Sequence, residues 1–153
     1  MSLSVSRERV LEALFSKLSR TTFRDVCGKT MFVSCSRRLQ LWSDVPASQR
    51  PALFMTEHHE TPTYRSENTP AVTTISVDVF VYIDASDRSR VPSTDLNSIL
   101  DGIDAALAPG PGEQRQTLGG IVSHCRMEGQ ILKDPGDLDG DGLLIIPVTI
   151  MLT

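Results

Sequence analysis

The fold is decided by the stretch Thr73–Asp84, which reads TTISVDVFVYID. Every second residue in it is a branched aliphatic side chain: Ile75, Val77, Val79, Val81 and Ile83. Successive side chains of a β-strand point to opposite faces, so the pattern predicts one strand with a fully apolar face. At roughly 3.3 Å per residue the strand would be about 40 Å long, well beyond the usual strand length.

Two amphipathic helices are predicted, one on each side of this strand in the sequence. In residues 4–19 the apolar side chains recur at intervals of three and four, and Ser4 or Ser6 can cap the start. The second helix carries its apolar stripe from Leu96 to Leu107, with Ser93 or Thr94 as the expected cap. Residues 109–112, which read PGPG, end it.

The remaining strands are predicted at 30–42, 52–55, 121–131 and 144–152. Pro147 cannot donate a ladder hydrogen bond, so the last strand is expected at a sheet edge or to be bulged there. Residues 56–70 are polar and aperiodic and are expected to form an extended loop. Glycine and aspartate in residues 134–142 predict a hairpin tip. Residues 1–153 should form a single α+β domain, a mainly antiparallel sheet with two helices packed on one face.

Charge is unevenly distributed along the 153 residues. The net charge is −4 and the pI about 5.3, which gives no general reason to expect nucleic-acid binding. Residues 1–50 nevertheless carry 9 Lys/Arg against 4 Asp/Glu, whereas the rest carries 6 against 15. Such a bipolar chain can pair with copies of itself, although solvated surface charge is an equally good interpretation.

Targeting signals and cysteine usage indicate a soluble, intracellular protein. Charged residues from Arg7 to Glu12 interrupt any signal-peptide core, and no apolar run reaches the roughly 18 residues of a membrane span. The three cysteines, Cys27, Cys35 and Cys125, are odd in number and irregularly spaced. They are therefore expected to be buried free thiols rather than a disulfide framework.

The sharpest local motif is Asp137–Gly142, which reads DLDGDG. Asp137, Asp139 and Asp141 occupy positions one, three and five of a calcium-loop pattern, and a glycine follows at position six. Position twelve should be a bidentate glutamate and is Val148 instead. An acidic hairpin turn is the favoured interpretation, and a calcium-binding module is the alternative from a different functional class.

Other candidate chemistry is weak. His58 and His59 lie between two glutamates, but neighbouring residues on a strand point to opposite sides and make poor joint metal ligands. The sequence contains no Gly-x-Ser-x-Gly, no phosphate-binding glycine loop and no His-Glu-x-x-His. We therefore expect no enzyme and no cofactor.

The chain as a whole resembles the tail terminator (tail completion) proteins of long-tailed bacteriophages. The resemblance is one of order and texture and spans nearly the full chain. It is carried by the helix Val10–Leu18, RLQLWSDVP at 38–46, PALF at 51–54, VFVYI at 79–83, LNSILDGI at 96–103, QTLGG at 116–120, GQI at 129–131 and IIPVTI at 145–150.

This resemblance implies a structural virion protein rather than an enzyme. It implies a homo-oligomeric ring, typically of six subunits, that caps the tail tube protein, ends its polymerisation and faces the head–tail connector, or neck, protein. DNA would pass through the lumen without sequence recognition, and no membrane would be involved. The expected location is the neck end of the virion tail, after assembly in the host cytoplasm. A head–tail joining or tail tube protein is the structural alternative.

Candidate residues for contacts between subunits lie in three segments. Arg37, Arg38 and Trp42 lie before Pro46, the first proline of the sequence. Trp42 is the sole tryptophan, and a core position is at least as good an interpretation for it as a contact anchor. His58, His59, Tyr64 and Arg65 lie in the predicted loop, and Asp137 and Asp139 lie at the predicted hairpin tip. Long strands leave uncovered edges that invite pairing with another chain, and a ring satisfies such edges by closing on itself.

Overall fold

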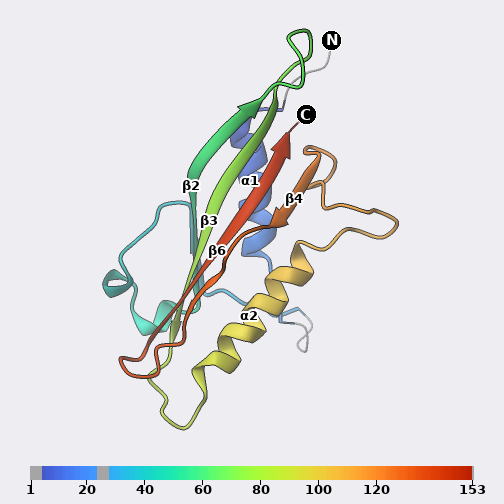
Figure 1. Cartoon of the computed structure of the whole chain (residues 1–153). Coiled ribbons are helices and arrows are strands. Elements are labelled where there is room, and N and C mark those ends of the chain that lie inside the picture. Colours follow the sequence, from blue (N-terminus) through green and yellow to red (C-terminus); the bar gives the residue numbers. More distant parts are fainter. Residues whose placement is uncertain (1–4, 24–27, 153) are drawn as a thin grey trace.

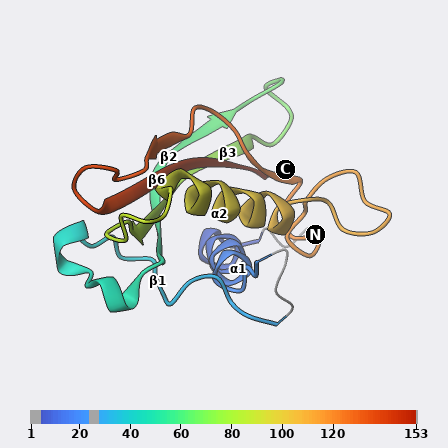
Figure 2. The same ribbon diagram turned by 90° about the horizontal axis from the view of Figure 1, so that it is seen from below.

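The computed structural model describes residues 5–23 and 28–152. It is an α+β fold in which two helices cover one face of a six-stranded, mostly antiparallel sheet, as predicted (Figures 1 and 2). The helices are α1 (Arg7–Ser19) and α2 (Pro92–Ala106), and two short 3₁₀ turns are η1 (Trp42–Asp44) and η2 (Ala47–Gln49). The strands are β1 (Ser34–Ser36), β2 (Ala52–Thr63), β3 (Val72–Asp84), β4 (His124–Met127), β5 (Leu132–Asp134) and β6 (Asp141–Leu152).

The three long strands form the middle of the sheet. Its order is β1-β2-β3-β6-β4, and β5 also pairs with β6. β1 runs parallel to β2, whereas every other pairing is antiparallel. β3 is paired along its whole length on the β6 side, from Thr73 opposite Leu152 to Asp84 opposite Asp141.

The predicted apolar face of β3 forms the sheet side of the hydrophobic core. Its five aliphatic side chains are all buried, and so are the matching residues of β6, Leu144 to Ile150 at every second position. α1 and α2 bury the predicted stripes against this face, with Leu14 and Ile103 fully inaccessible. The regular period of both helices and strands thus specified which side of each element faces inward.

Helix starts were predicted correctly for α1 alone. Ser6 caps α1, and its Oγ accepts a hydrogen bond from the Arg9 backbone N–H at 3.2 Å. Ser93 and Thr94 do not cap α2, because the helix begins earlier, with Val91 at the cap position and Pro92 in the first turn. Proline suits that place because its missing N–H would be unpaired there in any case.

The loop predicted for residues 56–70 is wrong over its first half. β2 continues through Thr63 and pairs with β3 up to Val72, which leaves a turn at residues 64–71. The pairing relies on backbone hydrogen bonds, and the side chains of Glu57–Thr63 are all exposed. With neither face buried, this part of the strand needs no apolar alternation, which is why no strand pattern was visible in the sequence.

The last strand was expected at a sheet edge or bulged at Pro147. The edge position is wrong, because β6 lies between β3 on one side and β4 and β5 on the other, and its register with β3 passes Pro147 without a shift. Pro147 falls between the stretches that pair with β4 and with β5. Its carbonyl accepts from the Glu128 N–H at 3.1 Å, so its nitrogen also faces that break and away from β3. Of the strand predicted at 121–131 only β4 (His124–Met127) forms, and β5 (Leu132–Asp134) lies beyond the predicted range, on the other side of the break at Pro147.

A smaller apolar cluster lies on the sheet face opposite the helices. It consists of Val45, Ala52, Phe54 and Tyr82, and the rings of Phe54 and Tyr82 are 5.2 Å apart. The Tyr82 hydroxyl donates to the Gln40 carbonyl oxygen at 2.7 Å. These contacts hold residues 40–49, including η1 and η2, against one end of the sheet.

The thiols are free in the described part of the chain. Cys125 is fully buried and Cys35 is half-buried, and both are unpaired. Cys27 lies outside the described residues.

Candidate subunit interface

The outer edge of β2 is the most open backbone surface of the sheet. β1 covers it only from Ala52 to Phe54, and among the described residues no strand pairs with it from Met55 to Thr63. The Pro51 carbonyl points to this side, because it accepts from the Val33 N–H at 2.8 Å. By the alternation of a strand, Met55 and Glu57 also point their N–H and C=O groups outward. An added strand could form ladder hydrogen bonds at these two residues.

Two features limit the same edge further along. The register slips between Glu57 and His59, so His58 is an extra residue in a β-bulge. Beyond the bulge, Thr61 lies opposite Thr74 and Pro62 opposite Thr73, which turns the nitrogen of Pro62 outward. Bulges and edge prolines both discourage further pairing. The pairing-competent stretch is therefore short and lies next to β1.

The bulge also changes the arrangement of the two histidines. The sequence predicted side chains on opposite sides of the strand. In the structure the two rings instead meet edge to face, with centroids 4.7 Å apart. His58 Nδ1 lies 3.7 Å from Asp78 Oδ2 of β3. Both histidines remain exposed, and no group of three potential metal ligands occurs within residues 5–23 and 28–152.

One ion pair fastens the exposed part of β2 to the helical layer. The Arg7 guanidinium at the start of α1 donates through Nε to both carboxylate oxygens of Glu60, at 2.9 and 2.8 Å. Tyr64 and Arg65 follow in the turn after β2, where both are exposed, Tyr64 to 67%. This turn and the start of α1 lie at the same end of the molecule (Figure 1).

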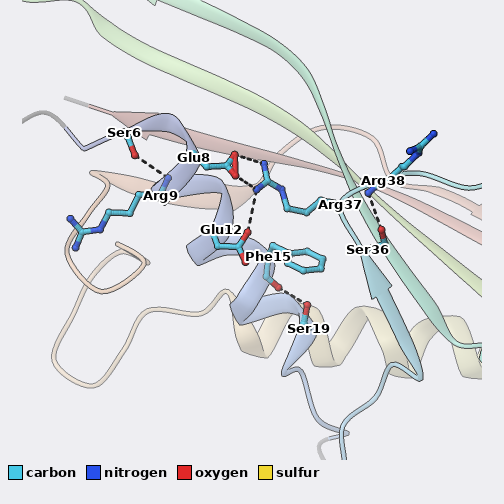
Figure 3. A network of polar contacts seen from close by, with 9 residues as sticks. All are labelled: Ser6, Glu8, Arg9, Glu12, Phe15, Ser19, Ser36, Arg37 and Arg38. Carbon is cyan, nitrogen blue, oxygen red and sulfur yellow. Dashed lines mark hydrogen bonds and ion pairs between the residues drawn. The ribbon is translucent and has the colours of Figure 1, made fainter.

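Arg37 is committed to its own chain. Its Nη2 donates to Glu8 Oε1 at 2.9 Å and its Nη1 to Glu12 Oε2 at 3.2 Å, so the segment after β1 is tied to α1 (Figure 3). The hydrogen bond from Arg37 lowers the pKa of Glu8 below its usual value. The same carboxylates raise the pKa of Arg37. The charge of Arg37 is thus paired within its own chain. A contact with another subunit through this guanidinium would have to share or replace these ion pairs.

Arg38 differs from its neighbour. Its backbone N–H donates to Ser36 Oγ at 3.0 Å, while its guanidinium points away from Glu8 and Glu12 (Figure 3). No ion pair engages it in the described part of the chain. Trp42, in the turn that follows, is 55% exposed, so it is not a core tryptophan.

A buried arginine that the sequence analysis missed organises this end of the sheet. Arg50 has a side chain only 6% exposed, and its guanidinium bridges η1 to the ends of β3 and β6. It donates to Asp141 Oδ1 at 2.6 Å and to the carbonyl oxygens of Trp42, Val45 and Ile83 at 2.8, 3.1 and 3.2 Å. Its partners are up to 91 positions away, so no local pattern could reveal them.

The acidic motif forms the predicted hairpin turn, between β5 and β6. Asp139 Oδ1 accepts from the Asp141 backbone N–H at 3.0 Å, and the Gly140 N–H donates to the Gly136 carbonyl at 2.9 Å. The Asp141 carboxylate, a candidate calcium ligand, is held by Arg50. Leu138, at the tip, is 99% exposed.

The predicted interface residues therefore fall into two groups. Tyr64 and Arg65 lie at the end of the sheet where β2 turns into β3, and the two histidines lie along β2 toward that end. Trp42 and the turn that carries Asp137 and Asp139 lie toward the opposite end, where Arg50 binds the Trp42 carbonyl and the Asp141 carboxylate. Arg38 belongs to neither group, because its backbone N–H binds Ser36 at the end of β1. A single contact patch does not contain them all.

Comparisons with known proteins found no matching family model and no matching curated protein. Among the described residues, no helix has both the length and the apolar character needed to span a membrane.

Proposed function

We propose that this chain is a structural subunit of the tail terminator type. In this proposal, copies close into a ring, of six subunits as the resemblance implies, that caps a phage tail tube and faces the head connector. The observation that carries the proposal is the outer edge of β2, where Met55 and Glu57 present backbone groups without a strand partner in the described chain. Open strand edges in a soluble domain are sites for pairing with another chain.

The exposed ribbon formed by β2 and β3 supports the same proposal. Glu57–Thr63 bury no side chain, so this part of the strand contributes little to the core. Ordering a residue costs about 1–2 kcal/mol of backbone entropy. A polar extension of this kind gains most when it contacts another molecule, and a neighbouring subunit or the tube end would supply that contact.

A closed ring explains how identical copies can each use the same open edge of β2. A contact between two different surfaces of the same chain repeats until the rotation closes, which satisfies every edge. The uneven charge, basic before residue 51 and acidic after it, suits such a contact between unlike surfaces. A head–tail joining or tube subunit would use the same features and differs in its place in the virion.

The test is the mass of the purified chain in solution combined with negative-stain images. Closed rings with an axial hole, alone or on purified tail tubes, are the expected result. A protein that stays monomeric at all concentrations and does not bind tubes would overturn the proposal. Labelling the chain in intact virions then distinguishes the terminator position from the joining and tube positions.

A further inference from the structure

The sheet has a second open edge, formed by β4 on the side opposite β1. The Glu128 N–H binds the Pro147 carbonyl of β6, so Met127, one residue earlier, points its N–H and C=O away from β6. Within the described residues no strand pairs with this outer side of β4. The Gln116 carbonyl accepts from the Cys125 N–H at 2.8 Å, so the chain itself covers the edge at Cys125 and leaves it open at Met127.

The open residues of the two edges lie in one row across the sheet. Glu57 of β2 is opposite Val77 of β3. Val77 is opposite Val148 of β6, which in turn is opposite Met127 of β4. Val77 and Val148 are buried in the core, and residues opposite one another share a face, so the whole row faces the helices. The row therefore begins and ends with a residue whose backbone groups point out of the sheet.

The two edge strands also have suitable directions. β2 and β6 both run antiparallel to β3, and β4 runs antiparallel to β6, so β4 is antiparallel to β2. A rotation about an axis along the strands keeps these directions, so the β4 edge of one copy meets the β2 edge of the next as an antiparallel pair, the more stable kind. Both helices cover the same face of the sheet (Figure 2), so a sheet extended in this way keeps all its helices on one side.

We propose that the ring contact, whose existence rests on the proposed function, is an antiparallel strand pair between β2 of one copy and β4 of the next. Glu57 and the neighbour's Met127 exchange two backbone hydrogen bonds, and Thr56 lies opposite the neighbour's Glu128. The row then continues at one level from copy to copy, which closes a ring whose strands run along its axis. A register two residues away would shift each copy by about 7 Å along the strands, and a repeated shift gives an open helix.

The two edges end at matching places. β2 is regular only up to Glu57, because His58 is the extra residue of the bulge. On β4 the Cys125 N–H is already bound within the chain, so an outward N–H is available only at Met127. When Glu57 and Met127 pair in antiparallel directions, these two limits fall on the same side of the pair. The ladder is short, but each copy in a closed ring makes two such contacts, which strengthens the whole assembly.

Complementation between two edge variants of the full chain is the first test. Glu57→Pro removes the outward N–H of β2 and Met127→Pro that of β4, while each strand keeps its inward hydrogen bonds. Each variant alone should stay monomeric at concentrations at which the unmodified chain assembles. Their equimolar mixture should form a one-to-one dimer and nothing larger, because each variant keeps one competent edge. Met127→Ala keeps its N–H and should assemble like the unmodified chain. Light scattering measures the masses.

Disulfide crosslinking tests the register. Thr56 and the neighbour's Glu128 would form a non-hydrogen-bonded pair, whose Cβ atoms lie close enough for a disulfide. With Cys27→Ser and Cys35→Ser in place, oxidation of a mixture of Thr56→Cys and Glu128→Cys chains should give a covalent dimer, and neither variant alone should. Thr61→Cys, on β2 beyond the bulge, is the matched control and should not crosslink to Glu128→Cys.

The outcomes separate this contact from the ring itself. Rings that form without a crosslink between positions 56 and 128, or from either proline variant alone, would overturn the contact and leave the ring proposal standing. A covalent dimer of Thr56→Cys alone, or a dimer of Met127→Pro alone, would show that two β2 edges pair across a two-fold axis and would also overturn it. So would an equimolar mixture of the proline variants that stays monomeric at the highest attainable concentration. An unmodified chain that never assembles would overturn both proposals.

Discussion

The guanidinium of Arg50 lies 2.6 Å from the carboxylate of Asp141, across 91 positions of sequence. The contact joins a residue two positions before β2 to the first residue of β6, and the same guanidinium binds the backbone of η1. One side chain thus determines where the segment carrying Leu41 and Trp42 lies relative to the turn carrying Leu138.

Replacing this arginine should destabilise the fold. Arg50→Met leaves the Asp141 carboxylate and three carbonyl oxygens without their donor, and removing one partner of a buried pair costs about 3 kcal/mol or more. The stability of Arg50→Lys should lie between those of the parent and Arg50→Met, because an ammonium cannot reach all four acceptors in the same geometry. Urea unfolding measures the free energy, and acrylamide quenching of Trp42 in the folded state reports release of η1. Equal stability of Arg50→Met and the parent would contradict the clamp.

Edge pairing makes a second prediction. Glu57→Pro removes an outward N–H while the hydrogen bonds from β2 to β3 are kept, so ring assembly should be lost or strongly weakened. Glu57→Ala keeps the N–H and should assemble like the parent. Light scattering gives the mass, and circular dichroism verifies that both variants are folded. Rings that form equally well with proline would exclude this part of the edge from the contact.

A glycine in the turn between β5 and β6 can be compared with a glycine in the loop after α2. Gly136 has φ +78°, and a Cβ there would lie 2.5 Å from the Asp141 carbonyl carbon. Gly112 has φ +76° but open space around a Cβ. Gly112→Ala should cost about 1 kcal/mol, the usual penalty of a left-handed alanine, and Gly136→Ala should cost about 1–2 kcal/mol more because backbone atoms must move. Thermal unfolding of the two variants measures the difference, and equal costs would show that the turn relaxes freely.

The pair formed by Glu8 and Arg37 should depend on pH. The pKa of Glu8 is lowered in the folded chain, so its stabilising contribution is present above the unfolded pKa of 4.5 and is lost as the pH falls through the folded pKa. The difference in Tm between the parent and Glu8→Gln should therefore be positive near pH 7 and shrink as the pH falls below 4.5 and through the folded pKa of Glu8. Because the carboxylate is exposed, added salt should also reduce the difference. A difference that is constant from neutral to acidic pH would show that the charge is not responsible.

Thiol reactivity tests the core. Burial raises the pKa of Cys125 to about 12, which leaves about one thiol in ten thousand ionised at pH 8. With Cys27→Ser and Cys35→Ser in place, a thiol reagent should label Cys125 only after denaturant is added. Rapid labelling of the folded protein would contradict the packing of β4 against α1 and α2. Cys35 tested alone should react faster, because it is only half-buried.

Elements with a buried face were predictable from sequence. The apolar residues of β3 and β6 alternate strictly, and α1 and α2 repeat at helical spacing, because in each case one side must be removed from water. The second half of β2 has no such requirement, since residues from Glu57 to Thr63 are exposed, and its partner strand determines its conformation. The inner position of β6 was missed because Pro147 was expected to need a sheet edge or a bulge, whereas a break between β4 and β5 serves as well.

Exposure of the proposed interface residues was easier to predict than the contacts that position them. Trp42, Arg38 and the acidic turn were identified by composition, and all are accessible. Arg50 was not identified, because an arginine before a proline has no distinguishing local pattern and its acceptors come from distant strands. The contact between the rings of His58 and His59 depends on an irregularity of register that periodicity cannot predict.

The bulge at His58 and the outward nitrogen of Pro62 have a consequence for proteostasis. A long, regular, uncovered strand can act as a template for fibre growth. In β2 the outward backbone groups are regular only up to Glu57, before the bulge at His58 and the proline at position 62. If the edge pairs with another copy as proposed, the bulge and the proline confine that pairing to a few residues and disfavour the long in-register stacking of an amyloid fibre.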